Sequence, residues 1–345
     1  MADPKVAAIP APRLLPWHMT AVEQLRGAWR NEHLPHALLL QGAEGLGKRM
    51  LAAWLAAAVL CDRSSGAALN FCGECAGCAL IKAATHPDLL WVAPEEDKQQ
   101  ISIDQLRAAA DRLTRTSLRR GFKVAVIEPA HQMTVSAANS VLKTLEEPSP
   151  PSLLILVTSR PSSLPATVRS RCQKITVARP TAQAAMVWLQ AESSSPVEHS
   201  LLEFAGGAPL RALEYAGGRF DALDEHMQKS LGNLLSGRAD VTQVAAEWEK
   251  DALNDRLVWL DLWLTSMART VLTGSADLVT FPSGSAHLPS LPRTLNISGV
   301  YSMVDRARAL KAQLARTALQ RELAVESWLI ALLDVLAPTT TPTDV

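Results

Sequence analysis

The segment from residue 36 to residue 60 constrains the fold of this chain more than any other. An apolar run, residues 36–41, leads into the loop Gly42-Ala43-Glu44-Gly45-Leu46-Gly47-Lys48, and a helical pattern covers residues 48–60. Glycines between a strand and a helix let backbone N–H groups surround a phosphate, which a lysine at the helix start neutralises. The pattern therefore predicts a phosphate-binding loop formed by Gly42, Gly45, Gly47 and Lys48. A plain glycine-rich turn is the alternative.

The first half of the chain alternates apolar runs with amphipathic stretches. The expected strands cover residues 36–41, 88–92, 123–127, 153–158 and 174–177, and the expected helices cover residues 48–60, 102–116 and 134–145. A further helix is expected to open at Thr20, which has capping-box spacing to Glu23. Residues 153–157 are apolar at successive positions, as a parallel strand buried on both faces requires. These patterns predict an α/β domain with a mostly parallel sheet.

The strand signals stop after Pro180. We expect an α/β domain over residues 1–179 with an insert at about 61–80, a small helical domain over 180–216, a helical C-terminal domain over 217–337 and a disordered tail over 338–345. A Gly/Ser/Pro-rich loop interrupts the helical domain at about 274–292. Apolar residues at helical spacing in 257–264 and 328–336 suit both the domain's own core and a contact with a partner, and internal packing is expected to use most of them.

Charge and hydropathy exclude several classes of protein. The 34 Lys and Arg residues balance 34 Asp and Glu residues, so bulk positive potential does not hold this chain on nucleic acid. The longest apolar run, residues 50–61, is too short for the ~20 residues that span a bilayer. Residues 1–13 lack the apolar core of a secretory signal. We therefore expect a cytoplasmic protein without a membrane segment.

The predicted phosphate loop departs from a working ATPase site at two places. The residue after Lys48 should be Ser or Thr, whose hydroxyl holds Mg²⁺, but it is Arg49. The strand over residues 123–127 ends in a single acid, Glu128, and Pro129 follows where a second acid could activate water. Glu128 itself could equally be a surface carboxylate at the end of a strand. Both departures predict that the chain does not hydrolyse ATP.

Four of the five cysteines, Cys61, Cys72, Cys75 and Cys78, lie within eighteen residues. Four thiolates around Zn²⁺ form a closed tetrahedral site with no open position for chemistry, so structural zinc is the main interpretation. An iron–sulfur cluster is one alternative, although its usual fourth cysteine would fall at Lys82. Ordinary free thiols are the other alternative.

Several motifs together resemble a known family, the delta-prime subunits of the bacterial DNA polymerase III clamp loader within the AAA+ superfamily. They are the phosphate loop, the four cysteines, Thr85-His86-Pro87-Asp88, the run from Ala137 to Pro148, Leu156-Val157-Thr158-Ser159 and Ser170-Arg171-Cys172. The resemblance is detailed over residues 34–180 and looser beyond. The catalytic sister subunit looks similar but would keep Lys-Ser/Thr and Asp-Glu, so Arg49 and Pro129 favour the non-hydrolysing member.

The resemblance implies roles for single residues. Arg171 matches an arginine that reaches across a subunit interface to the γ-phosphate of a neighbour's ATP. The alternative for Arg171 is a surface arginine or one in a salt bridge within the chain, and Arg169 is the nearest competitor for the role. Thr158 matches sensor 1, with a hydroxyl that merely ends a buried strand as the alternative. Arg211 lies in the region of sensor 2 without a secure match. The basic residues Arg112, Arg115, Arg119, Arg120 and Lys123 could face a neighbour or DNA, or form a solvated helix end.

The resemblance also implies partners and a process. The chain would be the stator of a heteropentamer with the gamma/tau ATPase subunits and the delta subunit, which loads the sliding clamp onto primed DNA in replication. Residues after Thr181 would form a lid-like domain, and the helical C-terminal domain one fifth of a collar. The chain would then be a component of the DNA polymerase III holoenzyme, a DNA-directed DNA polymerase and nucleotidyltransferase, but no enzyme alone. A self-sufficient AAA+ ATPase and a zinc-finger DNA reader are the competing hypotheses.

Overall fold

A computed structural model describes residues 9–64, 69–96, 98–119, 121–273, 297–314 and 320–336. The chain divides into two compact units, Met1–Thr181 and Ala182–Val345, each with buried apolar side chains of its own. Within the described residues, no helix is both long and apolar enough to cross a membrane. The finer division of the chain at residues 179, 216 and 337 stays a prediction, and the expected loop at 274–292 and tail at 338–345 lie outside the described residues.

The first unit is built on a five-stranded sheet in which all neighbouring strands are parallel. The order β2-β3-β4-β1-β5 joins strands β1 Ala37–Gln41, β2 Leu89–Val92, β3 Lys123–Ile127, β4 Ser152–Thr158 and β5 Gln173–Thr176. All five expected strands are present with bounds shifted by one residue at most. The predicted α/β fold with a parallel sheet is confirmed.

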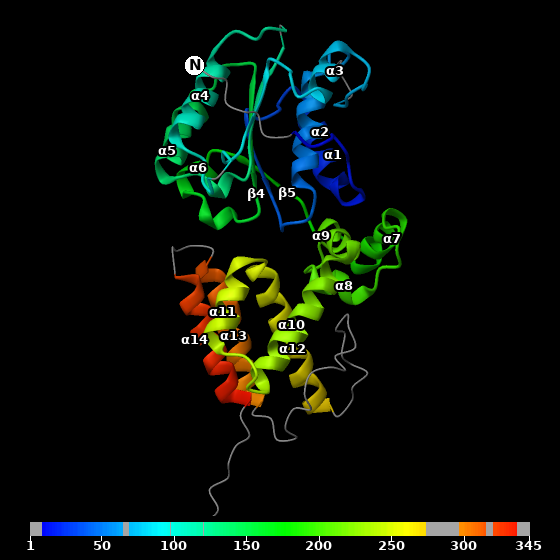
Figure 1. Cartoon of the computed structure of the whole chain (residues 1–345). Helices are drawn as coiled ribbons and strands as arrows, with labels where there is room; N and C mark the ends of the chain where they lie inside the picture. Colours follow the sequence, from blue (N-terminus) through cyan, green and yellow to red (C-terminus); the bar gives the residue numbers. More distant parts are fainter. Residues whose placement is uncertain are drawn as a thin grey trace, which may run out of the picture. The chain divides into compact units, whose positions relative to one another are not determined.

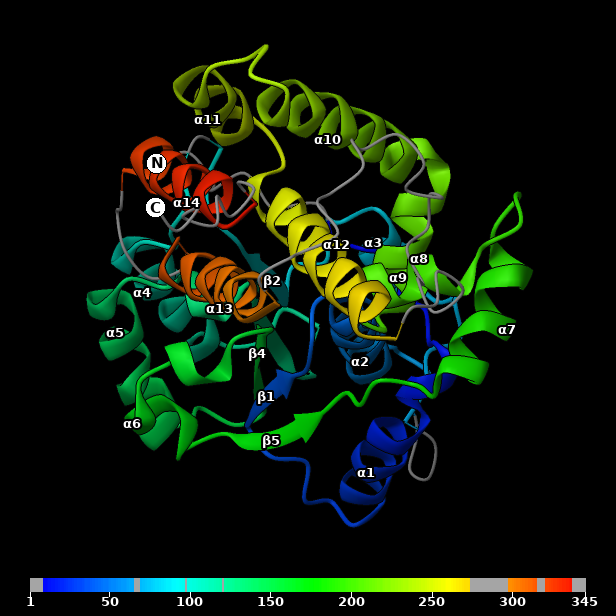
Figure 2. The ribbon, with the colours of Figure 1, turned by 90° about the horizontal axis from the view of Figure 1, so that it is seen from below.

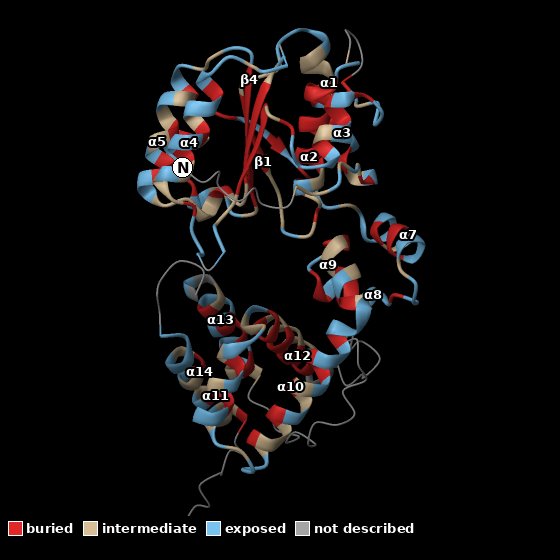
Figure 3. Ribbon diagram, turned by 45° about the horizontal axis from the view of Figure 1, so that its top comes forward, coloured by how far each residue is buried: buried red, intermediate tan, exposed pale blue. Residues whose placement is uncertain are grey.

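Helices cover both faces of this sheet. They are α1 Met19–Arg30, α2 Lys48–Leu60, α3 Ala76–Lys82, α4 Ile103–Thr114, α5 Val135–Glu146 and α6 Ala166–Arg169. Figure 1 shows α4, α5 and α6 on one face and α1, α2 and α3 on the other. Alternate strand residues such as Leu39, Ala125 and Leu156 pack in one cluster with Leu106 and Val141 of α4 and α5. Strands β1 and β4 are therefore buried on both faces, as Figure 3 shows.

Local sequence signals specify one helix start correctly and miss another. At α4 the expected capping box is present: the Gln105 amide donates to Ser102 Oγ at 3.4 Å, and the Ser102 amide donates to Gln105 Oε1 at 2.9 Å. The capping box predicted at Thr20 is wrong, because α1 begins at Met19 directly after the 3₁₀ turn Pro16–His18. A contact of the His18 ring with Leu46 O, at 2.8 Å, holds that turn, and short-range spacing does not reveal it.

The described part of the second unit is entirely helical, which confirms the expected change of class. Its helices are α7 Ala182–Glu192, α8 His199–Phe204, α9 Pro209–Glu214, α10 Phe220–Leu235, α11 Val241–Lys250, α12 Leu253–Thr273, α13 Ile297–Leu314 and α14 Arg321–Leu336. Helix α12 packs against α13, and α14 packs against α11 and α13, as Figure 2 illustrates. A π-helical turn, Tyr215–Arg219, links α9 to α10, with left-handed backbone at Gly218.

Internal packing uses the apolar stripes of the second unit, as expected. Trp259 and Leu260 of α12 and Leu329 of α14 are fully buried within this chain. The Trp259 indole N–H donates to Asp224 Oδ1 of α10 at 2.7 Å. Ile330 of α14 is an exception, because 48% of its surface is exposed. The stripes are therefore chiefly the core of this unit.

Candidate functional site

The carboxyl ends of strands β1, β3 and β4 meet at one edge of the sheet. The register pairs Gln41 with Thr158 and Ile127 with Leu156. The loop after β1, Glu128 after β3 and Thr158 at the end of β4 are therefore neighbours. Ligands bind preferentially at this end of a parallel sheet.

The N-terminal segment supports the backbone of the loop. Gly47, the residue before α2, has φ of 75°, and a Cβ there would lie 2.5 Å from Leu15 Cδ1. Leu46 O accepts hydrogen bonds from Trp17 Nε1 at 2.9 Å and from His18 Nε2 at 2.8 Å. Since the Leu15 amide donates to His18 Nδ1, the ring is neutral with its proton on Nε2. Burial lowers the pKa of His18, and this favours the same neutral form.

Lys48 lies inside the loop, at the first position of α2. Only 8% of its surface is exposed, and its Nζ donates to the carbonyl of Ala43 at 2.6 Å. Burial lowers the pKa of Lys48 to about 8, against the opposing attraction of Glu44 and Glu128. Among the described residues, no carboxylate forms an ion pair with this ammonium. The site therefore holds a largely buried cation on which Glu44 and Glu128 act through their charge, without a direct ion pair among the described residues.

Arg49 stands where a magnesium site would have a hydroxyl, and Glu128 is the one acid that remains of such a site. These two residues form an ion pair with each other. Arg49 Nε lies 2.7 Å from Glu128 Oε2, and the Trp91 indole N–H donates to the same oxygen at 3.4 Å. Burial raises the pKa of Glu128, while Arg49 acts against that rise. A guanidinium cannot be a metal ligand, and its partner carboxylate is already in use. These residues do not fit Mg²⁺.

Thr158, at the position that resembles sensor 1, is 1% exposed. Its Oγ1 accepts the Arg160 amide at 3.0 Å and lies 3.1 Å from His131 Nδ1. Burial lowers the pKa of His131, and the charge of Arg160 lowers it further, which favours the neutral ring. The Nδ1 of the neutral ring can accept a hydrogen bond from the Thr158 hydroxyl. The hydroxyl is thus used within the chain, as the structural alternative for Thr158 expected.

The four clustered cysteines come together at one point. All four Sγ atoms lie within 4.8 Å of one another, and the Cys61 Sγ lies 3.7 Å from Cys72 Sγ and 3.8 Å from Cys75 Sγ. Four sulfurs at ~2.3 Å from one tetrahedral ion would be about 3.8 Å apart. Backbone amides of Glu74 and Cys75 lower the pKa of Cys72 to about 6. The cysteines fit a single metal ion.

The four cysteines and helix α3 form a small substructure, here called the cysteine knob. Asp62 and Arg119 join this knob to the rest of the first unit. Asp62 Oδ2 accepts the Gly77 amide at 2.8 Å, at the start of α3. Arg119 Nη2 donates to both oxygens of Asp62, at 3.0 and 2.9 Å. The carboxylate of Asp88, from the Thr-His-Pro-Asp motif, accepts the Arg119 amide at 3.0 Å. Residues from α3, β2 and the loop after α4 thereby hold the knob in place.

The Ser170-Arg171-Cys172 motif divides into an exposed and a buried part. Arg171 Nη2 lies 2.6 Å from Glu146 Oε1 of α5, and both side chains are partly exposed. Cys172 is buried, and burial raises the pKa of its thiol to about 11. The Nε of Arg169 is also buried and has no hydrogen-bond partner among the described residues. Of the two arginines, Arg171 is exposed and Arg169 is partly buried.

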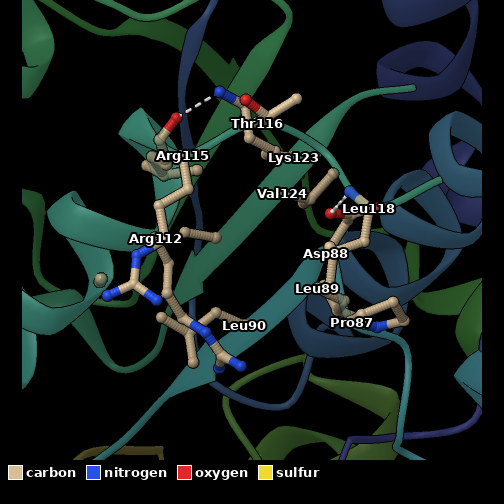
Figure 4. Close-up of a pocket in the computed structure, with 13 residues that line it drawn as sticks. Pro87, Asp88, Leu89, Leu90, Arg112, Arg115, Thr116, Leu118, Lys123 and Val124 are labelled. Carbon is tan, nitrogen blue, oxygen red and sulfur yellow. Dashed lines mark hydrogen bonds between the residues drawn. The ribbon is translucent and has the colours of Figure 1, made fainter. Parts of the chain in front are cut away.

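The basic run after α4 does not form one surface. Lys123 is buried in β3 and donates to the carbonyl of Leu113, while Arg119 is paired with Asp62. Arg112 and Arg115 are exposed and line a cavity of ≈ 180 Å³ with the start of β2 and β3 (Figure 4). Arg120 lies outside the described residues. Lys123 therefore fits neither a contact surface nor a solvated helix end, whereas the exposed Arg112, Arg115 and Arg119 leave both interpretations open.

Sequence reasoning found the loop and the cysteines but missed several contacts. The ion pair of Arg49 with Glu128 joins separate elements, and no short-range pattern predicts it. The ion pair of Arg171 with Glu146 is the intramolecular salt bridge expected as the alternative for Arg171, with a partner that the sequence did not name. The contact of His131 with Thr158 was also missed. The one signal for it in the sequence is that His131 follows the end of a predicted strand, four residues after Ile127. Arg211, left without an assigned role, donates to Asp255 Oδ1 at 2.6 Å.

Sequence comparisons with curated proteins show the family of this chain. A family model described as "DNA polymerase III, delta subunit" matches residues 17–181. The DNA polymerase III subunit delta' of Pseudomonas aeruginosa is 37% identical over 263 residues, which cover 75% of this chain and 79% of that protein. The subunit delta' of Escherichia coli (strain K12) is 30% identical over 331 residues, 94% of this chain and 97% of that protein. Among solved structures, a gamma subunit-related protein from Thermotoga maritima matches 90% of this chain and 99% of that chain, with a TM-score of 0.42 and 16% identity.

Proposed function

Because the chain belongs to the delta-prime family of DNA polymerase III subunits, we propose that it is the non-hydrolysing stator of the clamp loader. In this role it joins the gamma/tau ATPase subunits and the delta subunit in a heteropentamer. The complex then places the sliding clamp on primed DNA, and the chain itself contacts neither a membrane nor free DNA. Residues 180–216 form the lid in this proposal, and residues 217–337 form the collar segment.

The ion pair between Arg49 and Glu128 carries the non-hydrolysing part of this proposal. Hydrolysis of ATP needs a divalent ion that bridges the phosphates and a group that orients the attacking water. Arg49 stands in place of the metal-binding hydroxyl, and its guanidinium lies 2.7 Å from the one acid at the end of β3. The next residue, Pro129, has no proton-accepting side chain. The chain therefore lacks both parts of the hydrolytic machinery.

Arg171 gives this chain a role at another subunit's ATP. Its guanidinium can bind two phosphate oxygens at once and offset charge as the phosphate bond breaks. The ion pair with Glu146 is solvent-exposed, and such pairs contribute only about 0–1 kcal/mol, so a neighbour's phosphate can replace the carboxylate. The buried Cys172 beside it anchors the loop that presents the arginine.

The four cysteines hold structural Zn²⁺ in this proposal. Their sulfur separations suit one tetrahedral ion, whereas the several ions of an iron–sulfur cluster need more widely spaced sulfurs. With four protein ligands there is no open position for substrate. The metal stabilises the knob and takes no part in phosphate chemistry.

The test is an Arg171→Ala variant in the reconstituted complex. DNA-stimulated ATP hydrolysis and clamp loading should fall, by less than the ~10³–10⁵ of single-site systems because several sites share the ATP. Zinc content and assembly should be unchanged, and the isolated wild-type chain should show no turnover above background. Arg169→Ala is the matched control. Wild-type clamp loading by the Arg171 variant would refute the trans role, and turnover that Lys48→Ala abolishes would refute the non-hydrolysing role.

A further inference from the structure

The phosphate loop does not fit a magnesium ion, yet it keeps a largely buried lysine. The side chains that would hold the metal, Arg49 and Glu128, are ion-paired at 2.7 Å. A divalent ion on Glu128 would have to displace the guanidinium and would then lie beside its positive charge. Glu44, the other acid of the loop, is exposed and far enough away to act only through its charge. Metal binding here is therefore opposed by the chain's own cation.

Lys48 is the observation that points to a ligand. The Lys48 residue is 8% exposed, and its ammonium donates to the carbonyl of Ala43 within the loop at 2.6 Å, the one hydrogen bond of this group among the described residues. Burial of this charge is costly, since its pKa is lowered despite the attraction of Glu44 and Glu128, and an anion in direct contact would reduce that cost. Backbone N–H groups at the start of the thirteen-residue helix α2 add further donors.

We propose that Arg49 takes the place of the divalent ion, so that this loop binds the polyphosphate of a nucleotide without Mg²⁺. The inference rests on the assignment of Gly42, Gly45, Gly47 and Lys48 as a phosphate loop. A guanidinium beside Lys48 supplies a second positive charge and matches the geometry of two phosphate oxygens. It does not bridge a water or a leaving group as a metal does. The bound nucleotide is therefore retained rather than hydrolysed.

The experiment measures the binding of ADP to the full-length chain by calorimetry, with and without excess Mg²⁺. Metal-free buffer is prepared with a chelating resin rather than a soluble chelator, which would also remove metal from the cysteine site. The wild-type chain should bind ADP in metal-free buffer, and Mg²⁺ should not strengthen that binding. Inorganic pyrophosphate should displace ADP, since the phosphates are what the loop recognises.

Variants separate the contribution of Arg49 from that of the loop. Arg49→Thr should weaken metal-free binding roughly 10- to 100-fold, the range expected for lost charge-assisted hydrogen bonds, and should make binding improve with Mg²⁺. Lys48→Ala should abolish binding in both buffers. Arg107→Ala removes an arginine from an exposed ion pair with Asp104 on α4 and should change nothing.

Four results would each overturn the inference. They are wild-type binding that strengthens about tenfold or more with Mg²⁺, no binding in metal-free buffer, ADP that pyrophosphate cannot displace, and an Arg49→Thr variant that binds as tightly as the wild type. Because the readout is binding by the isolated chain, these results are independent of clamp loading and of Arg171. Failure here and failure of the proposed function are therefore distinguishable.

Discussion

At the scale of single residues, the most informative side chain is Lys48. Its folded-state pKa is about 8, whereas the unfolded chain holds the same proton up to about 10.5. Between these values the unfolded state binds more protons, so this residue makes stability rise with pH in that window. Relative to Lys48→Met, the wild-type free energy of unfolding should increase by about 2 kcal/mol from about pH 7 to about pH 10. Urea denaturation of both proteins at several pH values measures this difference.

Comparison with the variant removes the contribution of thiols and tyrosines, which titrate alike in both proteins. A parallel pH dependence of the two chains would mean that Lys48 is not buried as a cation. Saturating pyrophosphate should flatten the wild-type curve near pH 8, because a bound anion restores the ordinary pKa of the lysine. This links the stability measurement to the proposed ligand.

At the scale of elements, the start of α2 is the least tolerant of change. Gly47 has φ of 75°, and an added Cβ would lie 2.5 Å from Leu15 Cδ1 and 3.2 Å from the His18 ring. Gly47→Ala should destabilise the chain by ~2–4 kcal/mol from backbone strain and overpacking. Gly27→Ala is the matched control, because Gly27 lies inside α1 and an added Cβ there meets nothing within 4 Å. It should stabilise the chain by ~0.5–1 kcal/mol in the same denaturation experiment.

The cysteine knob is a second element with its own prediction. Metal analysis of protein purified without added metal should find one zinc per chain and none in Cys72→Ser. Hydrogen exchange in α3 should then accelerate, while the amides of the sheet keep their protection because the sheet has a separate core. Cys172→Ala, at the buried cysteine outside the cluster, should keep the zinc. Iron in the wild type, or no metal, contradicts the assignment.

At the scale of the whole molecule, an exposed apolar stripe on α14 suits a subunit contact. Leu323 and Ile330 are 56% and 48% exposed and stand seven residues apart, so they share one face of the helix. The double variant Leu323→Glu/Ile330→Glu should fold and keep its zinc but fail to co-purify with the other clamp-loader subunits, because a contact there would bury two charges. Size-exclusion chromatography of the reconstituted mixture measures assembly.

Arg321→Glu adds the same kind of charge at an exposed position of α14 off this stripe, and its assembly should be normal. If the double variant assembles as well as the wild type, α14 does not form the collar contact. A double variant that fails to fold would show that the two side chains belong to the core, contrary to their exposure. Circular dichroism and zinc content distinguish this outcome.

The sequence alone determined the features that depend on short-range pattern. Continuous apolar runs predicted all five parallel strands, and Gly-x-x-x-x-Gly-Lys predicted the loop between β1 and α2. Cys72, Cys75 and Cys78 are close in sequence, at or just before the start of α3, and Cys61 at the end of α2 completes the cluster of four sulfurs. Each signal lies within a few residues of the structure that it specifies. Buried strands, a glycine-rich loop and clustered cysteines can therefore be predicted from the sequence.

Only the tertiary structure decided which charged side chains form ion pairs or are buried, and where helix α1 begins. Arg49 forms an ion pair with Glu128 because parallel strands β1 and β3, which these residues follow, have their carboxyl ends at the same edge of the sheet. Lys123, for which the sequence left a partner contact or a solvated helix end open, is buried because its strand lies between β2 and β4. Helix α1 starts before the predicted cap at Thr20 because His18 bonds to the distant Leu46 carbonyl. Long-range contacts outweigh local preference at these residues. A buried polar group without a hydrogen bond is costly, and its partner often comes from a distant part of the sequence.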